Sequence, residues 1–229
     1  MELMRKIALG IILLAFLTAA YFYPQMPERM ASHWDASGEV NGYMGKDIGL
    51  FLMPFLSLAL FGLFIALPKL DPMRENYRYF MREYEGMIAL VTAFLYYIYV
   101  LTLLYNLGYA FDMTRLLAPA FGVFIMYMGI VVSKAKRNWF VGIRTPWTLS
   151  SDVVWDKTHK VCSGLFRASG IVAFIGTAYR PALMVSVAML VATAVFAVVY
   201  SYLEFRRETK GAKRPAGGKR RGKRKPPEK

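Results

Sequence analysis

The sequence predicts an all-α integral membrane protein with six transmembrane helices and with interfacial amphipathic helices in its loops. The 229-residue chain is 56% hydrophobic and only 19% charged. Its apolar residues gather in six stretches, most of them near the length of about 20 residues that a helix needs to cross the hydrocarbon core of a bilayer. These stretches contain no Asp, Glu or Lys, and their only full charge is Arg167.

The predicted spans are Ile7–Tyr23, Ile48–Leu67, Met87–Leu107, Leu116–Val132, Gly164–Ala178 and Ala182–Leu203. The fifth is the weakest, because it has only 15 residues and contains Arg167. If its helix begins earlier, near Thr158, the arginine lies close to the membrane interface and its guanidinium can reach water. The alternative is an interfacial or re-entrant helix.

The distribution of Lys and Arg between the spans predicts the orientation. Outside the C-terminal tail, the N-terminus and the second and fourth loops hold 12 Lys and Arg, whereas the alternate loops hold four. We therefore expect a multi-pass protein of the cell membrane with both termini in the cytoplasm. The first span could instead be a signal peptide, but its apolar run of 17 residues is long for that purpose.

The extracytoplasmic loop Pro24–Asp47 separates the first two spans. Met26, Met30 and Trp34 recur at four-residue spacing, which predicts a short amphipathic helix lying on the membrane. The tetrapeptide that begins at Asp35 is typical of a turn.

The cytoplasmic loop Lys69–Glu85 is expected to form an amphipathic helix that leads into the third span. Asp71 is a good N-cap, and Pro72 is a good first helical residue. An apolar stripe follows at helical spacing, formed by Tyr77, Phe80, Met81 and Tyr84. A separate stripe of three arginines is expected to contact anionic headgroups.

The cytoplasmic segment Lys134–Ser163 holds three of the four tryptophans, which prefer the membrane interface. Pro146 fixes a turn, and Ser150 or Ser151 can cap a helix that begins near Asp152. On that helix Val154, Thr158 and Val161 are expected to share one face.

We divide the chain into an N-terminal membrane region (1–107), a C-terminal membrane region (108–205) and a basic tail (206–229). The tail supplies +10 of the net charge of +14, so we expect it to be disordered and attracted to anionic lipid. Because these charges do not lie on a folded surface, we expect no direct nucleic acid binding.

The predicted spans offer little for coupled transport or catalysis. Ion-coupled transporters usually keep an ionisable residue at mid-membrane, and these spans contain no acid. His33 with Asp35 and Glu39 would be a weak metal site, and a loop histidine beside a tryptophan is more often structural. His159 and Cys162 lie on the other side of the predicted membrane. We therefore expect no enzyme activity, no cofactor and no metal.

Two loops resemble a known family. The stretch 26–46, MPERMASHWDASGEVNGYMGK, resembles the N-terminal domain of unknown function in the SdpI immunity protein family. Its matching positions are Pro27, His33, Trp34, Asp35, Gly38, Gly42 and Lys46. The stretch 138–159, NWFVGIRTPWTLSSDVVWDKTH, is similar to the family's C-terminal signature. Its matching positions are Asn138, Phe140, Gly142, Arg144, Thr145, Pro146, Trp147, Leu149, Ser150, Trp155, Thr158 and His159.

The resemblance covers about residues 5–203 and implies a six-span membrane protein. It also implies protection against a secreted, membrane-active peptide toxin, and signalling in which a small DNA-binding repressor is retained at the membrane. The first set of positions would then meet the peptide outside, and the second set would meet the protein partner inside. Two alternatives stay open. A small-solute channel or permease would require Arg167, Asn106 and tyrosines of the third span to line one cavity, and a structural envelope protein would use its loops only as anchors.

Overall fold

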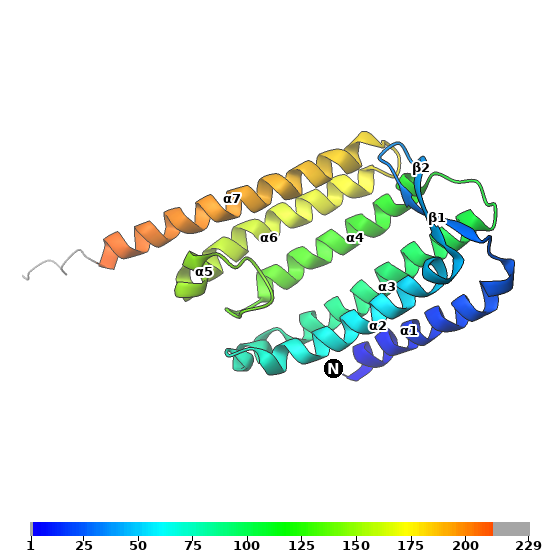
Figure 1. Ribbon diagram of the computed structural model, residues 1–229. Coiled ribbons are helices and arrows are strands. Elements are labelled where there is room, and N and C mark those ends of the chain that lie inside the picture. The colour runs from blue at the N-terminus through cyan, green and yellow to red at the C-terminus, as the bar shows by residue number, and fades with distance from the viewer. Residues whose placement is uncertain (1, 213–229) are drawn as a thin grey trace, which may run out of the picture.

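The computed structural model describes residues 2–212, which form an elongated, mostly helical bundle (Figure 1). Six long helices run along it: α1 (Glu2–Phe22), α2 (Lys46–Leu70), α3 (Met81–Asn106), α4 (Met113–Lys134), α6 (Asp152–Ile175) and α7 (Pro181–Ala212). The shorter elements are the 3₁₀ helices η1 (Tyr23–Gln25) and η2 (Arg74–Tyr79), the strands β1 (Arg29–Trp34) and β2 (Val40–Gly45), and the helix α5 (Pro146–Ser150).

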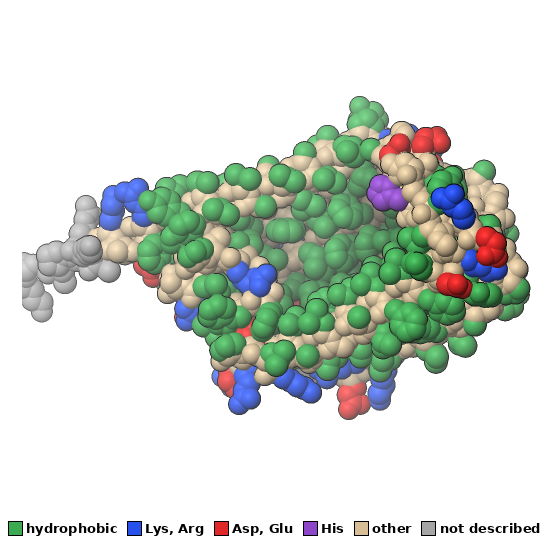
Figure 2. Space-filling model, viewed as in Figure 1, with side chains coloured by type: hydrophobic (Ala, Val, Ile, Leu, Met, Phe, Trp, Pro, Cys, Tyr) green, Lys and Arg blue, Asp and Glu red, His purple; other side chains and the backbone are tan. Residues whose placement is uncertain are grey.

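Five of the long helices, α1, α2, α3, α4 and α7, are long and apolar enough to cross a membrane by length and composition. α6 is not among them, because Asp152, Asp156, Lys157 and Lys160 occupy its first half. Hydrophobic side chains cover the flanks of the bundle, whereas most charged ones gather towards its two ends (Figure 2). A belt of this kind suits a lipid environment.

The helices form two groups, α1–α2–α3 and α4–α6–α7, which meet where α3 packs on α4. The contact between α4 and α6 is the most extensive, and glycines make it possible. A Cβ atom at Gly122 would lie only 2.8 Å from the carbonyl oxygen of Gly170. The two backbones therefore approach more closely than side chains would allow, as small residues permit in membrane helices.

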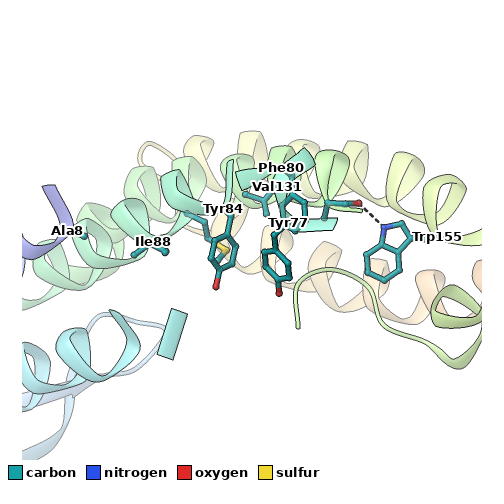
Figure 3. Close-up of a cluster of buried hydrophobic side chains, with 9 residues drawn as sticks. Ala8, Tyr77, Phe80, Tyr84, Ile88, Val131 and Trp155 are labelled. Atoms are coloured by element: carbon teal, nitrogen blue, oxygen red, sulfur yellow. Dashed lines mark hydrogen bonds between the residues drawn. The ribbon is translucent and has the colours of Figure 1, made fainter. Parts of the chain in front are cut away.

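Buried side chains gather at both ends of the bundle. One cluster lies beneath the strands and includes Met26, Met30 and Tyr99. The other, at the opposite end, includes Tyr77 and Trp155 and joins the two helix groups (Figure 3).

The predicted amphipathic helix between the first two spans is wrong, because this segment forms an antiparallel β-hairpin. Met26 and Met30 are buried in the protein core, whereas the prediction placed them on the membrane surface. The hairpin is stabilised from the side by Asn106 at the end of α3. Its side-chain amide accepts a hydrogen bond from the Ala31 N–H (2.7 Å) and donates one to the Ala31 carbonyl (3.0 Å). No local spacing pattern contains this long-range partner.

The second loop also differs from its prediction. The chain forms the 3₁₀ helix η2 before α3 begins at Met81, and Asp71 does not cap a helix. Tyr77, Phe80 and Tyr84 do form one buried group, with 1% exposure each. They face the protein core and not the membrane interface.

Two further expectations concern the ends of the last two long helices. Ser151 caps α6 as predicted, since its hydroxyl accepts a hydrogen bond from the Val154 N–H at 3.3 Å. Val154 and Thr158 are buried on that helix, whereas Val161 is exposed. The prediction that the tail is disordered is wrong for residues 206–212, which continue α7, and residues 213–229 lie outside the described part of the chain.

Candidate functional site

The turn of the β-hairpin is held by the Asp35 carboxylate. Its Oδ1 atom accepts hydrogen bonds from the Ser37 hydroxyl (2.6 Å), the Ser37 N–H (2.8 Å) and the Glu39 N–H (3.1 Å). These bonds, that of the Ser37 hydroxyl above all, hold the pKa of Asp35 below its usual range. Gly38 completes the turn with φ +84°, a conformation that L side chains rarely adopt. Asp35 and Gly38 are therefore positioned to build the turn.

His33 and Trp34 lie at the end of β1. The His33 ring is exposed, and its Nδ1 lies 2.5 Å from Asn41 Oδ1. Gly42 leaves room for it, because a Cβ atom there would be 2.9 Å from the His33 Cβ. Trp34 is half-buried and meets Tyr105 of α3 edge to face, with ring centroids 5.2 Å apart.

Lys46 begins α2 at the base of the hairpin. Its ammonium group lies over the Tyr23 ring, 4.6 Å from the centroid, and 3.5 Å from the Glu28 carboxylate. No group of three or more metal-ligating side chains occurs among residues 2–212, so His33, Asp35 and Glu39 do not form such a site.

Arg180, in the turn between α6 and α7, joins three segments at this end of the bundle. Its guanidinium donates a hydrogen bond to the Ser37 carbonyl (2.8 Å) and forms an ion pair with Asp112 between α3 and α4. Burial alone would raise the pKa of Asp112, but the hydrogen bond from Arg180 and that from the Arg115 N–H hold it below its usual range. Sequence reasoning counted Arg180 only as a loop charge, because nothing local indicates its partners.

At the opposite end, Asn138 organises the loop between α4 and α5. The side chain is fully buried. Its Oδ1 accepts hydrogen bonds from the N–H groups of Phe140 (2.9 Å) and Val141 (2.6 Å). Its Nδ2 donates to the carbonyls of Lys136 and Val141, both at 2.8 Å. The amide therefore replaces backbone pairing that this loop lacks.

His159, which precedes the predicted fifth span, is hydrogen-bonded to the same loop. Its Nε2 accepts a hydrogen bond from the Ile143 N–H (2.9 Å), so its Nδ1 carries the proton and donates to the Trp155 carbonyl (2.8 Å). Burial lowers the pKa of His159 to about 4, so the ring is neutral at pH 7. Gly142 lies directly over the ring with φ +115°, where a Cβ atom would collide with the imidazole.

Trp155 and Thr145 fasten the loop to the neighbouring helices. Trp155 is fully buried, stacks on His159 with ring centroids 4.0 Å apart, and donates from Nε1 to the Ala135 carbonyl at 2.8 Å (Figure 3). Thr145 and Thr148 form a capping box at the start of α5. The Thr145 hydroxyl also donates to the Ser201 hydroxyl of α7 at 3.0 Å.

The predicted partner-binding positions therefore fall into two sets. Asn138, Thr145, Trp155, Thr158 and His159 are buried and can affect a partner only through the shape of the loop. The accessible positions are Phe140 and Trp147, which are half-buried, and Arg144 and Pro146, which are exposed. Arg144 donates to the Trp139 carbonyl (2.8 Å), and Trp147 packs on Tyr202 of α7 with ring centroids 5.1 Å apart. Gly142 lies between the two sets.

The loop is also joined to the other helix group. Asp71 accepts a hydrogen bond from the Trp139 N–H at 2.9 Å, and Asn76 donates to the Arg137 carbonyl at 2.7 Å. A cleft of about 350 Å³ lies beside this junction, lined by Asn76, Tyr79, Lys136, Arg137, Asp152 and Asp156. The junction was missed because its partners are more than 60 residues apart in the chain.

The residues that would have to line one cavity in a channel contact different partners instead. Asn106 is bound to the hairpin, as described above. Arg167 is exposed on α6 beside Gly129 of α4, and its Nε donates to the Ser163 carbonyl at 3.3 Å. In the third span, Tyr97 donates to the Leu116 carbonyl and Tyr105 contacts Trp34.

Comparison with known proteins assigns both loops to named families. Residues 134–201 match the SdpI/YfhL protein family, and residues 10–58 match a domain of unknown function, DUF1648. The chain is 25% identical over 166 residues to the Immunity protein SdpI of Bacillus subtilis (strain 168), an alignment that covers 72% of this chain and 77% of that protein. No solved structure matches. In the signature loop (138–159), in the N-terminal region and over most of this relative, the chain is similar to the SdpI/YfhL protein family.

Proposed function

We propose that this chain is a membrane immunity and sensor protein of the SdpI type. It would protect its host against a secreted, membrane-active peptide and report the encounter to a small DNA-binding repressor in the cytoplasm. The observation that carries the proposal is the match to the Immunity protein SdpI over 72% of the chain.

The proposal places six spans in the membrane, with α6 as the fifth and both chain ends in the cytoplasm. α6 lies beside α4 and α7 along its length, so any membrane that they cross surrounds it as well (Figure 1). At about 1.5 Å per residue α6 extends over about 36 Å, and its charged first half, with His159, would lie at the cytoplasmic interface outside the hydrocarbon core. Within residues 2–212, the loops richest in Lys and Arg, 69–82 and 134–160, lie at the end that carries η2 and α5, as expected for a cytoplasmic face.

In this orientation the hairpin lies at the outer surface. It presents the exposed His33 and Tyr43 rings, with Trp34 half-buried beside them. Aromatic rings with one polar edge favour the depth of the lipid headgroups. A peptide lying on the outer leaflet would therefore meet this surface first.

The cytoplasmic partner would bind the exposed part of the signature loop, around Arg144 and Pro146. This loop is joined to α7 through Thr145 and to the other helix group through Asp71. A shift between the two groups would therefore change the loop. Such coupling needs two states of the bundle, and the peptide would have to bind one of them better.

The test is expression of the chain in a bacterium that a panel of secreted membrane-active peptides kills. We expect improved survival against at least one peptide. The double variant His33→Ala/Trp34→Ala should lose it, whereas Glu39→Gln, on the same hairpin, should keep it. No protection by the parent chain at normal membrane abundance would overturn the immunity role.

Signalling has a separate readout. A small DNA-binding protein should crosslink to the parent chain in peptide-treated membranes and be lost from the Arg144→Ala variant. Protection without any such capture would restrict the function to immunity. A conductance in liposomes that depends on Arg167 would instead favour the channel alternative.

A further inference from the structure

We propose that the cytoplasmic end of the N-terminal helix group binds one anionic phospholipid, by its phosphodiester headgroup and the upper part of an acyl chain. The site is a cavity of about 350 Å³ between α1, α2, η2 and α3. Its lining residues are Arg5, Phe64, Ile65, Pro68, Lys69, Arg74, Glu75, Met81 and Tyr84. This inference does not depend on the proposed immunity role.

The polar side of the cavity carries three cations from three different elements. Arg5 of α1 is positioned by the Glu85 carboxylate, which is 1% exposed and lies 2.8 Å from the guanidinium. This pair is neutral as a unit. Lys69 lies in the last turn of α2, and Arg74 begins η2.

The remaining charges match one phosphodiester. Lys69 and Arg74 face a single acid in the lining, Glu75, whose carboxylate is 3.9 Å from the Arg74 Nε. That distance is close to the upper limit for an ion pair. Besides Nε, the Arg74 guanidinium has further N–H donors that can bind a phosphate. Lys69 and Arg74 against Glu75 leave one net positive charge, which a phosphate monoanion neutralises.

The opposite wall of the cavity is apolar. Phe64, Ile65 and Met81 are partly buried and pack against the core cluster of this end. Phe64 lies about one helical turn from Pro68, on the side of the bilayer centre. The donation of the Tyr84 hydroxyl to the Phe64 carbonyl (2.6 Å) satisfies both groups, so no hydrogen bond is lost when an acyl chain covers this wall.

The depth of the cavity fits a lipid and not a soluble anion. It lies where the apolar part of α2 ends at Pro68 and the charged segment begins at Lys69. Phospholipids place their phosphate and first methylenes at this level, and basic pockets between helices on the cytoplasmic side hold acidic headgroups. Free phosphate would use the cations but gain nothing from the apolar wall, and a choline headgroup would bring a cation towards Lys69 and Arg74.

The test is native mass spectrometry of the delipidated full chain in neutral detergent, titrated with dioctanoyl phosphatidylglycerol. The double variant Lys69→Gln/Arg74→Gln should bind it at least about tenfold more weakly than the parent chain. The matched control Lys6→Gln/Arg78→Gln removes two exposed cations near the same membrane end and outside the lining, and should bind as the parent chain does. Dioctanoyl phosphatidylcholine should bind the parent chain weakly.

Three outcomes would overturn the proposal. An equal loss in both double variants would mean that only general charge attraction acts. Equal binding of the phosphatidylcholine lipid would mean that the headgroup charge is not recognised. Displacement of phosphatidylglycerol by millimolar inorganic phosphate would identify a soluble anion as the ligand. Thermal unfolding of both variants with the midpoint of the parent chain would exclude misfolding as the cause of a loss.

Discussion

Arg180, in the turn between α6 and α7, forms an ion pair with Asp112 between α3 and α4 and also donates a hydrogen bond to the Ser37 carbonyl at the tip of the hairpin. The hairpin carries the residues proposed to meet a peptide, and the pair lies between it and the helices that lead to the signature loop. At the other end of the molecule, Asp71 and Trp139 make the corresponding connection. The two helix groups are thus joined at both ends as well as along α3 and α4.

Replacing Arg180 by Met should loosen the hairpin with little effect on overall stability. Both partners are partly exposed, with side-chain exposures of 46% and 26%, and exposed ion pairs contribute about 0–1 kcal/mol. We expect faster amide hydrogen exchange at the hairpin turn and an unchanged unfolding midpoint. Arg29→Gln, on the same hairpin, is the control, and unchanged exchange in Arg180→Met would show that the pair does not restrain the turn.

Replacing Asn106 by Leu should destabilise the hairpin more strongly. It removes both partners of the buried Ala31 backbone, and an unsatisfied buried N–H costs about 1–3 kcal/mol. The expected result is a lower unfolding midpoint in detergent, together with faster exchange at Ala31. Asn41→Ala removes an exposed amide from the other strand and should leave the midpoint unchanged. If both variants unfolded alike, Asn106 would not be the anchor.

The Asn106 contact shows where prediction from sequence ends. Apolar length located α1, α2, α3, α4 and α7, and Ser151 was found as a cap because its partner is three residues away. The hairpin was mistaken for a helix, because Met26 and Met30 fit helical spacing, whereas strand β1 is bonded to Asn106 and packs on α2. The contacts of Arg180 with Ser37 and Asp112 and the packing of Gly122 on Gly170 were missed for the same reason, because each depends on a neighbour far along the chain. Among the signature positions, the resemblance identified the right loop but could not separate buried supports from exposed surface.

The buried His159 should make stability depend on pH. Its pKa of about 4 lies below the ordinary value of 6.5, so between these values the unfolded chain binds a proton that the folded chain does not. Stability from this group is therefore complete above about pH 6.5 and falls as the pH drops towards 4, by at most about 3 kcal/mol. Denaturant unfolding at a series of pH values should show this fall in the parent chain and a smaller one in His159→Gln. Parallel profiles for the two proteins would exclude His159 as the cause.

The close contact of α4 and α6 should not tolerate a methyl group. In Gly122→Ala the new Cβ would lie 2.8 Å from the Gly170 carbonyl oxygen and 3.1 Å from the Phe174 nitrogen, which are backbone atoms that cannot rotate away. Overpacking of this kind costs about 1–3 kcal/mol. Gly62→Ala in α2 is the matched control, because nothing lies within 4 Å of its Cβ position. We expect a lower unfolding midpoint for the first variant only, and equal midpoints would contradict the close approach of the two helices.

The Asp71 carboxylate is the most direct link between the second loop and the signature loop, so Asp71→Ala should release Trp139. Asp71 is 2% exposed, and its two oxygens accept from the N–H groups of Met73 and Trp139. Hydrogen bonds to a charged group contribute about 1.5–3 kcal/mol. We expect faster exchange at residues 138–143 and a changed Trp139 emission.

Asp156→Ala is the control, because it removes an exposed acid that pairs with Lys136 and makes no bond to the second loop within residues 2–212. If the signature loop reports the relative position of the two helix groups, Asp71→Ala should also uncouple repressor capture from peptide treatment, while protection by the hairpin end persists. Faster exchange at residues 138–143 would show that the loop is released in Asp71→Ala. If capture of the repressor by that variant still responded to the peptide, the signalling route would run elsewhere, through Thr145 and α7.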